Sequence, residues 1–448
     1  MKQAIADSAR VPYSVVMGLR LTGDETAVWQ AAARVLDANW TGTATVPSPG
    51  LYPHQWSWDS AFVCLGLARY RPERARIELL SVFRGQWATG LVPHIVFSSS
   101  VPRHAYFPGP EFWRSRAQPD APRGVDTSGL AQPPLQALAA LRMAQRPGRE
   151  EHRAFLTRLY PRLAAQHAYL ERDRDVAGSG LVSLCHPWES GLENSPAWDG
   201  PLAAVAPPLS PYARGGPPGD GGDADRYVSL VTSLRNAGYR AEYLRDDHPF
   251  VVEDPLFNAV YLASTHALAE VAELAGADPG RHREAAQRIH RAMLDRLWDE
   301  QTCCFRARDV RTGQLIPAAT IAGFVPLLDP ELPPPVVRGL TELLLSARFA
   351  GATGYPVPTC DVQSAAFDRC AYWRGPTWVN TNWLVWLGAL THRLDAVADL
   401  LLGSTLRLVR QSGFREYFDP FDGTGRGSHD FSWSAALILD LLDSRRAP

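Results

Sequence analysis

The stretch DETAVWQAAARVLDAN, residues 24–39, shows the pattern that decides the fold. It begins with Asp24, and Val28, Ala32 and Leu36 follow at a spacing of four residues, which places them on one face of a helix. The same periodicity returns in about twelve segments, including residues 254–276 and 430–444. Alternating strand patterns are scarce, and short candidates such as CCFRARD, residues 303–309, favour local hairpins. We therefore expect an all-α fold.

Two long connections interrupt the helical pattern. Residues 98–129 and 201–225 are rich in Pro and Gly, and the first also carries many aromatic residues. Such loops in a compact domain are usually functional or disordered. We expect both to form a lid over the site, with disorder as the alternative for the second. No break in composition divides the chain, so we expect a single domain over residues 1–448, built as a toroid of helical hairpins.

The composition argues against several classes of function. The formal net charge of −2 provides no strong field to attract nucleic acid or a membrane surface. Lys2 is the only lysine, so neither a Schiff-base mechanism nor a Walker-type phosphate loop has the lysine it needs. The six cysteines show no C-x-x-C pair and the twelve histidines no metal-ligand spacing, so we expect no metal. The lack of a signal peptide or a long apolar run favours a cytoplasmic protein without a membrane partner.

Four segments are rich in Trp or Tyr, and three of them also carry carboxylic acids. They are residues 51–62 (LYPHQWSWDSAF), 186–199 (HPWESGLENSPAWD), 372–383 (YWRGPTWVNTNW) and 415–433 (REYFDPFDGTGRGSHDFSW). A solvent loop has no use for so many tryptophans, and a core has no use for the acids. The mixture is typical of a sugar site, where rings stack on sugar faces and acids bind hydroxyls or transfer protons. Any one segment alone also fits a capped, half-buried helix start, as Asp59 would provide.

Cleavage of a glycosidic bond needs a pair of carboxyl groups. One gives its proton to the leaving oxygen, and the other activates water or attacks the sugar. The two groups lie roughly 6.5–9.5 Å apart in inverting enzymes and about 5–5.5 Å apart in retaining ones. Aromatic surroundings raise the pKa of the acid by desolvation, so that it keeps its proton. Glu193 and Glu416, which lie in two distant aromatic segments, are our candidates for this pair.

Together these segments resemble glycoside hydrolase family 63, in particular its small bacterial members, the mannosylglycerate and glucosylglycerate hydrolases. The motifs PHQWSWDSAF, GQWATGLVPHIVF, HPWESGLENSPAWD, VEDPLFNAVYLA, YWRGPTWVNTNW and EYFDPFDGTGRGSHDFSWSAALILDLL follow in order between Tyr52 and Leu442. The resemblance implies an (α/α)6 barrel that hydrolyses an α-glycosidic bond with inversion. It implies no cofactor and a small-molecule glycoside as substrate. The sequence does not determine the oligomeric state and allows a homo-oligomer.

The resemblance also implies roles for individual residues. Glu416 matches the general base of the family's E-Y-x-D-P motif. The segment DADRYVSLV resembles the part that closes over the substrate, where Arg226 and Tyr227 are candidates to bind its carboxylate, because an Arg fork can hold both oxygens. The sugar-binding positions match Tyr52, Trp56, Asp59 and Gln132, and the aromatic wall matches Tyr372, Trp373 and Trp378.

One position departs from the family. The family's general acid is an Asp in E-S-G-x-D, and this chain has Glu193 there, which reaches one methylene farther. Either Glu193 replaces this Asp as the general acid, or the protein acts on a different glycoside whose oxygen lies elsewhere. Alternatively, the protein is a catalytically silent carbohydrate-binding protein, or a family member with different glycoside-tailoring chemistry. Glu189 and Asp199 are lesser candidates, whose other role is hydrogen bonding within the loop.

The leading prediction is an inverting α-glycosidase that acts on a small anionic glycoside such as glucosylglycerate or mannosylglycerate. Glucose and mannose differ in the orientation of one hydroxyl group, and the sequence does not place the groups that would bind it. The choice between the two sugars therefore stays open.

Overall fold

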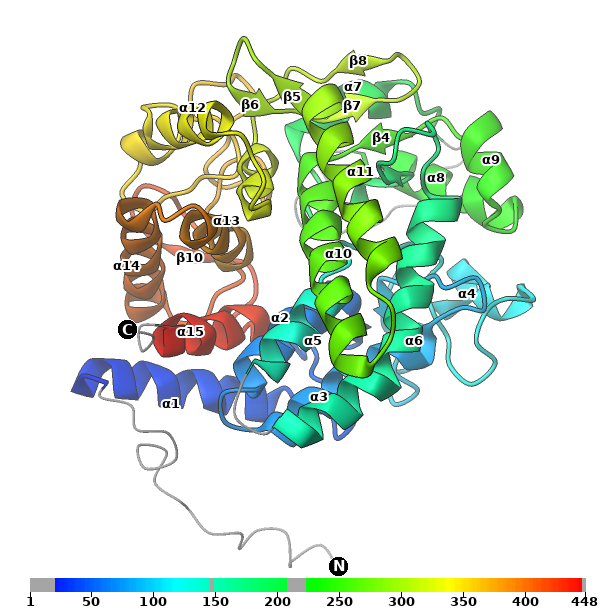
Figure 1. The fold of residues 1–448 in the computed structure, drawn as a ribbon, viewed down its shortest axis with the longest axis horizontal. Coiled ribbons are helices and arrows are strands. Elements are labelled where there is room, and N and C mark those ends of the chain that lie inside the picture. The colour runs from blue at the N-terminus through cyan, green and yellow to red at the C-terminus, as the bar shows by residue number, and fades with distance from the viewer. Residues whose placement is uncertain (1–20, 146–148, 208–222, 445–448) are drawn as a thin grey trace, which may run out of the picture.

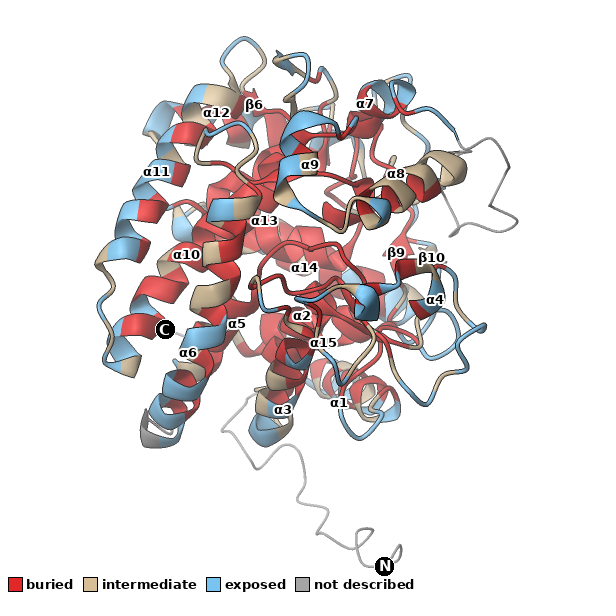
Figure 2. Ribbon diagram, turned by 90° about the vertical axis from the view of Figure 1, so that its right-hand side faces the viewer, coloured by how far each residue is buried: buried red, intermediate tan, exposed pale blue. Residues whose placement is uncertain are grey.

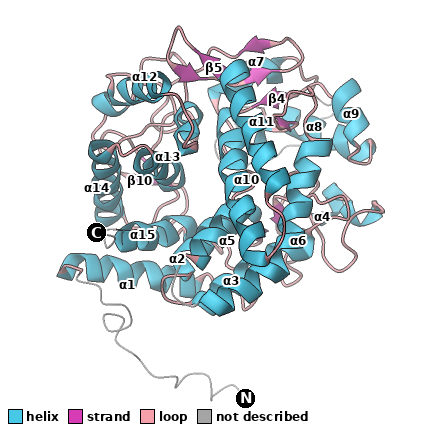
Figure 3. Cartoon of the chain, in the orientation of Figure 1, coloured by secondary structure: helices cyan, strands magenta, loops and turns pink. Residues whose placement is uncertain are grey.

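The computed structural model describes residues 21–145, 149–207 and 223–444 (Figure 1). It is mostly helical with short strands, as the periodicity predicted (Figure 3). The α-helices are α1 (Gly23–Ala38), α2 (Ser57–Leu67), α3 (Pro72–Val82), α4 (Pro110–Trp113), α5 (Gln136–Ala144), α6 (Arg149–Asp173), α7 (Asp199–Ala203), α8 (Ala224–Asn236), α9 (Ala241–Asp246), α10 (Pro255–Ala275), α11 (Gly280–Leu297), α12 (Pro334–Leu345), α13 (Val379–Thr391), α14 (Asp395–Ser412) and α15 (Ser432–Ser444). The strands are β1 (Gln55–Trp56), β2 (Ile95–Val96), β3 (Ser183–Leu184), β4 (Val252–Glu253), β5 (Trp298–Asp299), β6 (Cys304–Phe305), β7 (Arg308–Asp309), β8 (Gln314–Leu315), β9 (Tyr417–Phe418) and β10 (Gly425–Arg426).

Six elements pack side by side in a closed ring. In order they are α15, α2, α5, α10, the 3-10 helix η5 (Ile321–Leu328) and α13, which returns to α15. Every residue of α2 and of η5 is buried, as expected for helices enclosed on all sides. Figure 2 shows the buried residues concentrated in the interior of the molecule.

A second layer of helices covers the ring from outside. Helix α1 packs on α15, α3 on α2, α6 on α5 and α10, α11 on α10, α12 on η5, and α14 on α13. Each of these needs only one apolar face. In α11, for example, Ala285, Ile289, Ala292 and Met293 are buried at spacings of three or four residues.

A buried ionic cluster ties several ring elements together. The Asp440 carboxylate on α15 accepts hydrogen bonds from Arg142 of α5 (3.3 Å), from the indole N–H of Trp383 of α13 (2.9 Å), and from Arg69, just after α2. Arg69 also bonds Asp443 at 2.7 Å. Asp440 is fully buried, so its charge depends on these partners. The cluster therefore links the last helix to elements from the first third of the chain.

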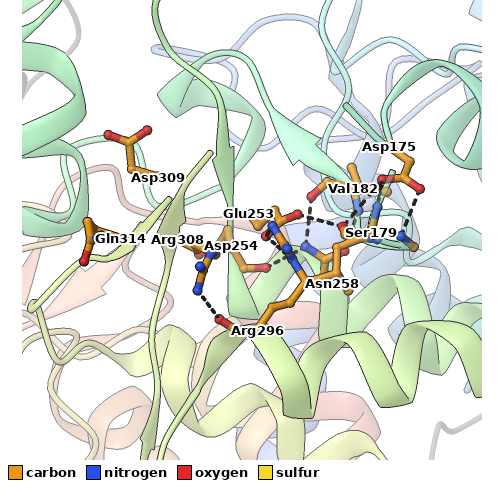
Figure 4. A network of polar contacts seen from close by, with 12 residues as sticks. Asp175, Ser179, Val182, Glu253, Asp254, Asn258, Arg296, Arg308, Asp309 and Gln314 are labelled. Carbon is orange, nitrogen blue, oxygen red and sulfur yellow. Dashed lines mark hydrogen bonds and ion pairs between the residues drawn. The ribbon is translucent and has the colours of Figure 1, made fainter. Parts of the chain in front are cut away.

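The largest sheet is antiparallel and joins β3, β4, β7 and β8 in that order. Residues 303–309 contribute β6 and β7, which form short hairpins with β5 and β8, as predicted. A polar network beside the sheet ties it to α10 and α11 (Figure 4). Asn258 accepts from the Val182 N–H (2.8 Å) and donates to its carbonyl (2.9 Å), and Glu253 accepts from Ser179 (2.7 Å) and Arg296 (2.9 Å).

The described parts of the two long connections lie on one side of the ring. Helix α4 belongs to the connection 98–129 and α8 begins at the end of 201–225, and both lie on the right in Figure 1. Residues 208–222 of the second connection lie outside the described residues. Within the described ranges, no helix combines the length and apolar character needed to cross a membrane.

Candidate active site

A cavity of about 280 Å³ brings together residues from five distant parts of the chain. Most of its wall is aromatic or apolar, and no Arg or Lys is among the described residues that line it. The lining consists of Gly50, Leu51, Tyr52, Trp56, His94, Ile95, Ala105, Tyr106, Phe107, Pro108, Gln132, Trp188, Glu193 and Tyr372.

Glu416 lies directly behind two tyrosines of this wall. Its Oε1 accepts hydrogen bonds from the hydroxyls of Tyr52 (2.9 Å) and Tyr372 (3.0 Å), and its Oε2 accepts one from the Ser428 N–H (2.9 Å). Burial raises the pKa of Glu416 above its usual value, while these three donors act in the opposite direction. The carboxyl is thus oriented by donors that stabilise its ionised form, which is the form a general base needs.

A glycine makes room for the Glu416 carboxyl. Gly427 has a φ of +63°, and a Cβ atom at this position would lie 2.5 Å from the Glu416 Oε2. A side chain there would meet both the unfavourable backbone conformation and the carboxyl group. One glycine of the GTGRGS stretch therefore serves the placement of Glu416.

Glu193 lies in the cavity wall, on the loop that follows a short 3-10 helix, Pro187–Glu189. Gly191, with a φ of +71°, lets this loop lie against the Trp58 ring, because a Cβ there would be 2.5 Å from the ring. The Tyr227 hydroxyl donates to the Glu193 carbonyl oxygen at 2.6 Å. The backbone of Glu193 is therefore held from two sides.

Asp59 lies close to both carboxyls. It is buried near the start of α2, and burial together with the charges of Glu193 and Glu416 raises its pKa well above the usual range. Burial raises the pKa of Tyr372 well above its usual value, and the charges of Glu416 and Glu193 raise it further. Glu193, Glu416, Asp59 and the tyrosines thus form one electrostatic cluster around the cavity.

The family of the chain follows from sequence comparison. Residues 52–434 match the family described as the mannosylglycerate hydrolase MGH1-like glycoside hydrolase domain. The chain belongs to this family. It is a glycoside hydrolase, as the residues around Glu193 and Glu416 predicted.

Individual relatives agree with this assignment. The chain is 39% identical to a mannosylglycerate hydrolase of Rubrobacter radiotolerans over 92% of this chain and 96% of that protein. It is 37% identical to a glucosylglycerate hydrolase of Mycolicibacterium hassiacum, with coverages of 92% and 96%. The crystal structure of the family 63 mannosylglycerate hydrolase from Thermus thermophilus in complex with Tris and D-glycerate superimposes with a TM-score of 0.85, at 38% identity, covering 92% of this chain and 99% of that one.

The predicted aromatic wall of the hydrolase is only partly exposed to the cavity. Tyr372 lines it, whereas Trp373 and Trp378 are buried outside the lining and stack on each other with ring centroids 3.7 Å apart. The Trp378 indole donates to the Tyr372 carbonyl at 2.9 Å. These two tryptophans therefore support Tyr372.

Gln132, a predicted sugar-binding residue, lines the cavity, and its Oε1 accepts a hydrogen bond from the Trp58 N–H at 3.3 Å.

Arg226 and Tyr227, the candidates for binding the substrate carboxylate, bond groups of the protein in this structure. Arg226 pairs with Asp223 at 2.7 Å and donates to the Val205 carbonyl at 3.2 Å, outside the cavity lining. Tyr227 is buried, and its hydroxyl is bonded to the loop of Glu193. In this structure neither side chain lines the cavity.

The two lesser acid candidates of the glycoside hydrolase have structural partners. Glu189 is fully buried, and although burial alone would raise its pKa, the Arg174 guanidinium and two backbone N–H donors lower that pKa to about 2. Asp199 is exposed and pairs with Arg374, with 2.9 Å between its Oδ1 and the guanidinium. The side chains of both therefore bond groups outside residues 186–199, namely Ala131, Arg174 and Cys185 for Glu189 and Arg374 for Asp199.

Sequence reasoning missed several residues of the cavity wall. Tyr106 and Phe107 come from the 98–129 connection, whose aromatic content was the available signal. Trp188 packs edge to face with Tyr227 at 5.8 Å. His94 lies in the motif GQWATGLVPHIVF, but nothing in the sequence marks it as a residue of the cavity wall. Burial lowers its pKa to about 3, so it is a neutral ring that hydrogen-bonds Ser128 at 2.6 Å. Among the described residues, no group of three or more His, Cys, Asp or Glu could hold a metal ion.

Proposed function

We propose that this glycoside hydrolase cleaves the α-glycosidic bond of mannosylglycerate or glucosylglycerate with inversion. The observation that carries the proposal is the arrangement of two carboxyl groups at one aromatic cavity, with Glu193 in its wall and Glu416 bonded to Tyr52 and Tyr372 of the same wall. Relatives named as mannosylglycerate and glucosylglycerate hydrolases support the choice of substrate.

The proposed reaction uses the two carboxyls in opposite protonation states. Glu193 gives its proton to the glycosidic oxygen as the bond to the anomeric carbon breaks. Ionised Glu416 takes a proton from a water molecule, which attacks the anomeric carbon from the other face of the sugar. Tyr52 and Tyr372 keep Glu416 oriented, since both hydroxyls donate to its Oε1.

The remaining site residues would bind the two halves of the substrate. Trp56 and Gln132 line the cavity and are placed to hold the sugar, whereas Asp59 is buried outside its lining. Because no Arg or Lys lines the cavity in the described structure, a cation that moved there would give a glycerate carboxylate its strongest hydrogen bonds. Arg226 would serve if the substrate carboxylate replaced Asp223 as its partner.

We further propose that the fold is an (α/α)6 barrel and that residues 1–448 form one domain. The closed ring of six elements and its outer helical layer support the barrel. The Asp440 cluster, which joins α15 to residues near α2 and α5, supports one cooperative unit. The aromatic residues of 98–129 in the cavity wall support a covering role for that connection.

The test is sugar release from mannosylglycerate and glucosylglycerate by the full chain and two variants. Glu416→Gln and Glu193→Gln should each lower kcat by on the order of 10²–10⁴, the usual contribution of a general acid or base. Glu273→Gln is the control, because Glu273 is an outer-surface residue of α10 paired with Arg283. Wild-type turnover by Glu416→Gln would remove Glu416 from the mechanism, and no turnover of either compound by the wild type would overturn the proposed substrates.

A further inference from the structure

Asn194, the residue after Glu193, connects the Glu193 loop to the segment that carries Tyr372. Its side-chain Oδ1 accepts a hydrogen bond from the Trp373 N–H at 2.8 Å, and its Nδ2 lies 3.5 Å from the Ala371 carbonyl oxygen. Its own carbonyl accepts from the Arg374 guanidinium at 3.1 Å. The side chain is buried, so these bonds are shielded from competing water. Asn194 thus contacts the backbone on both sides of Tyr372.

The backbone of Tyr372 depends on such contacts. Tyr372 has a φ of +46°, in the left-handed region that a tyrosine rarely adopts. A conformation of this kind costs on the order of 1–3 kcal/mol and persists only where the surroundings enforce it. The bonds from Asn194 to residues 371 and 373 enclose the strained residue from both sides, and the Trp378 indole bonds its carbonyl.

Tyr372 in turn contacts Glu416. Its hydroxyl donates to the Glu416 Oε1 at 3.0 Å and lies 3.2 Å from the Tyr52 hydroxyl. A short path therefore runs from one carboxyl to the other. It passes from Glu193 through the peptide bond to Asn194, across the hydrogen bonds to the neighbours of Tyr372, and through Tyr372 to Glu416.

We propose that Asn194 is a positioning residue that sets the separation of the Glu193 and Glu416 carboxyls. This inference rests on the proposed roles of those two residues. An inverting mechanism tolerates separations of only roughly 6.5–9.5 Å, because one water molecule must fit between the groups. A displacement of about 1 Å can cost on the order of 10²-fold in rate. A buried side chain that connects the Glu193 loop to the segment bonded to Glu416 should therefore affect kcat strongly.

The inference predicts a split between kcat and KM. Trp56 and Gln132 line the cavity and lie on segments that Asn194 does not bond in any of these contacts, whereas Tyr372 is the lining residue that it supports. Loss of the Asn194 bonds should therefore lower kcat by about 10²-fold while KM changes by a clearly smaller factor. Because the Tyr372 hydroxyl then aligns poorly with the Glu416 carboxyl, the pKa of that carboxyl should rise. The acidic limb of the pH profile, where kcat rises with pH as Glu416 ionises, should therefore move to higher pH.

The experiment compares Asn194→Leu, Asn194→Ser and Asn194→Asp with the wild type, by kcat, KM, pH profile and melting temperature. Asn194→Leu and Asn194→Ser lose the bond to Trp373, whereas Asn194→Asp keeps an acceptor and should recover about tenfold or more of the lost kcat. Asn258→Leu is the matched control. Asn258 is also buried and also bonds backbone groups through both its side-chain atoms. Those groups belong to Val182 and Asp254, outside the cavity lining. The Asn258→Leu variant should lower the melting temperature without moving the acidic limb of the pH profile.

Crystal structures of the wild type and Asn194→Ser supply a readout that does not depend on turnover. The inference predicts that the distance between the two carboxyl carbons changes by about 1 Å or more in the variant. An unchanged distance, or a folded Asn194→Leu or Asn194→Ser with wild-type kcat and acidic limb, would overturn it. If the wild type releases no sugar from either glycosylglycerate, the proposed function fails, and the measured distance still decides the role of Asn194.

Discussion

Replacing Tyr372 by Phe removes one of the three donors to Glu416 while leaving the aromatic ring in the cavity wall. The lost bond is the 3.0 Å contact between the Tyr372 hydroxyl and the Glu416 Oε1. The 2.9 Å bonds from Tyr52 and from the Ser428 N–H remain. Since Glu416 is almost completely buried, no bulk water is at hand to replace the lost donor.

The size of the effect follows from the strength of such bonds. A hydrogen bond to a charged group contributes about 1.5–3 kcal/mol, and one pKa unit corresponds to about 1.4 kcal/mol. Burial already raises the pKa of Glu416 and the Tyr372 bond lowers it, so Tyr372→Phe should raise that pKa by about one to two units. The base must be ionised to act. The acidic limb of the kcat/KM profile should therefore move to higher pH by the same amount.

The assay is the pH dependence of kcat/KM for whichever glycosylglycerate the wild type hydrolyses faster. Tyr355→Phe is the control, because the Tyr355 hydroxyl bonds Gln411 at 2.6 Å, outside the cavity lining. This variant should keep the wild-type profile. A folded Tyr372→Phe whose acidic limb stays at the wild-type position would refute the claim that this bond controls the ionisation of Glu416.

Four further predictions concern Glu189, Gly427 and Glu193. Glu189→Ala should lower the free energy of unfolding by about 3–5 kcal/mol in urea titrations, because it leaves the buried Arg174 without its carboxylate. In the wild type, Glu189 has a pKa of about 2, against 4.5 in an ordinary chain, so its ionised form stabilises the fold by about 3 kcal/mol. This contribution should be complete above about pH 4.5 and disappear as the pH falls toward 2. A free energy of unfolding that does not fall between pH 4.5 and pH 2 would contradict this. Gly427→Ala should reduce kcat by about 10²-fold, since its Cβ would displace Glu416, and an unchanged kcat would show that the carboxyl has room to move. Glu193→Asp should lower kcat by a similar factor, because the backbone held by Tyr227 cannot follow the shorter side chain; a large gain instead would indicate that Glu is a poor acid here and that the natural substrate is a different glycoside.

The helical fold could be predicted because apolar periodicity is a local property. Residues 24–39, 254–276 and 430–444 repeat every three to four residues, and all three fall within or around helices. The element η5 of the inner ring was missed, because residues 321–328 are apolar throughout and contain Pro326, which leaves no helical stripe to detect.

The composition of the site could be predicted further than its geometry. Acids among aromatic residues indicated a sugar site, and Glu193, Tyr52 and Tyr372 do share one cavity. The direction of each side chain was not accessible, because it depends on contacts between distant residues. Trp373 and Trp378 share a motif with Tyr372 but stack behind it, and the bond between Tyr52 and Glu416 joins residues 364 positions apart. No periodicity encodes such a contact.

The central claim is that Glu193 and Glu416 act across one cavity with a water molecule between them. The most direct test is ¹H NMR of the sugar anomer released in the first minutes of hydrolysis of mannosylglycerate or glucosylglycerate, before mutarotation mixes the two forms. Attack by water on the face opposite the leaving glycerate predicts that the β-anomer appears first. Initial release of the α-anomer would indicate a covalent intermediate, and with it a different use of these two carboxyls.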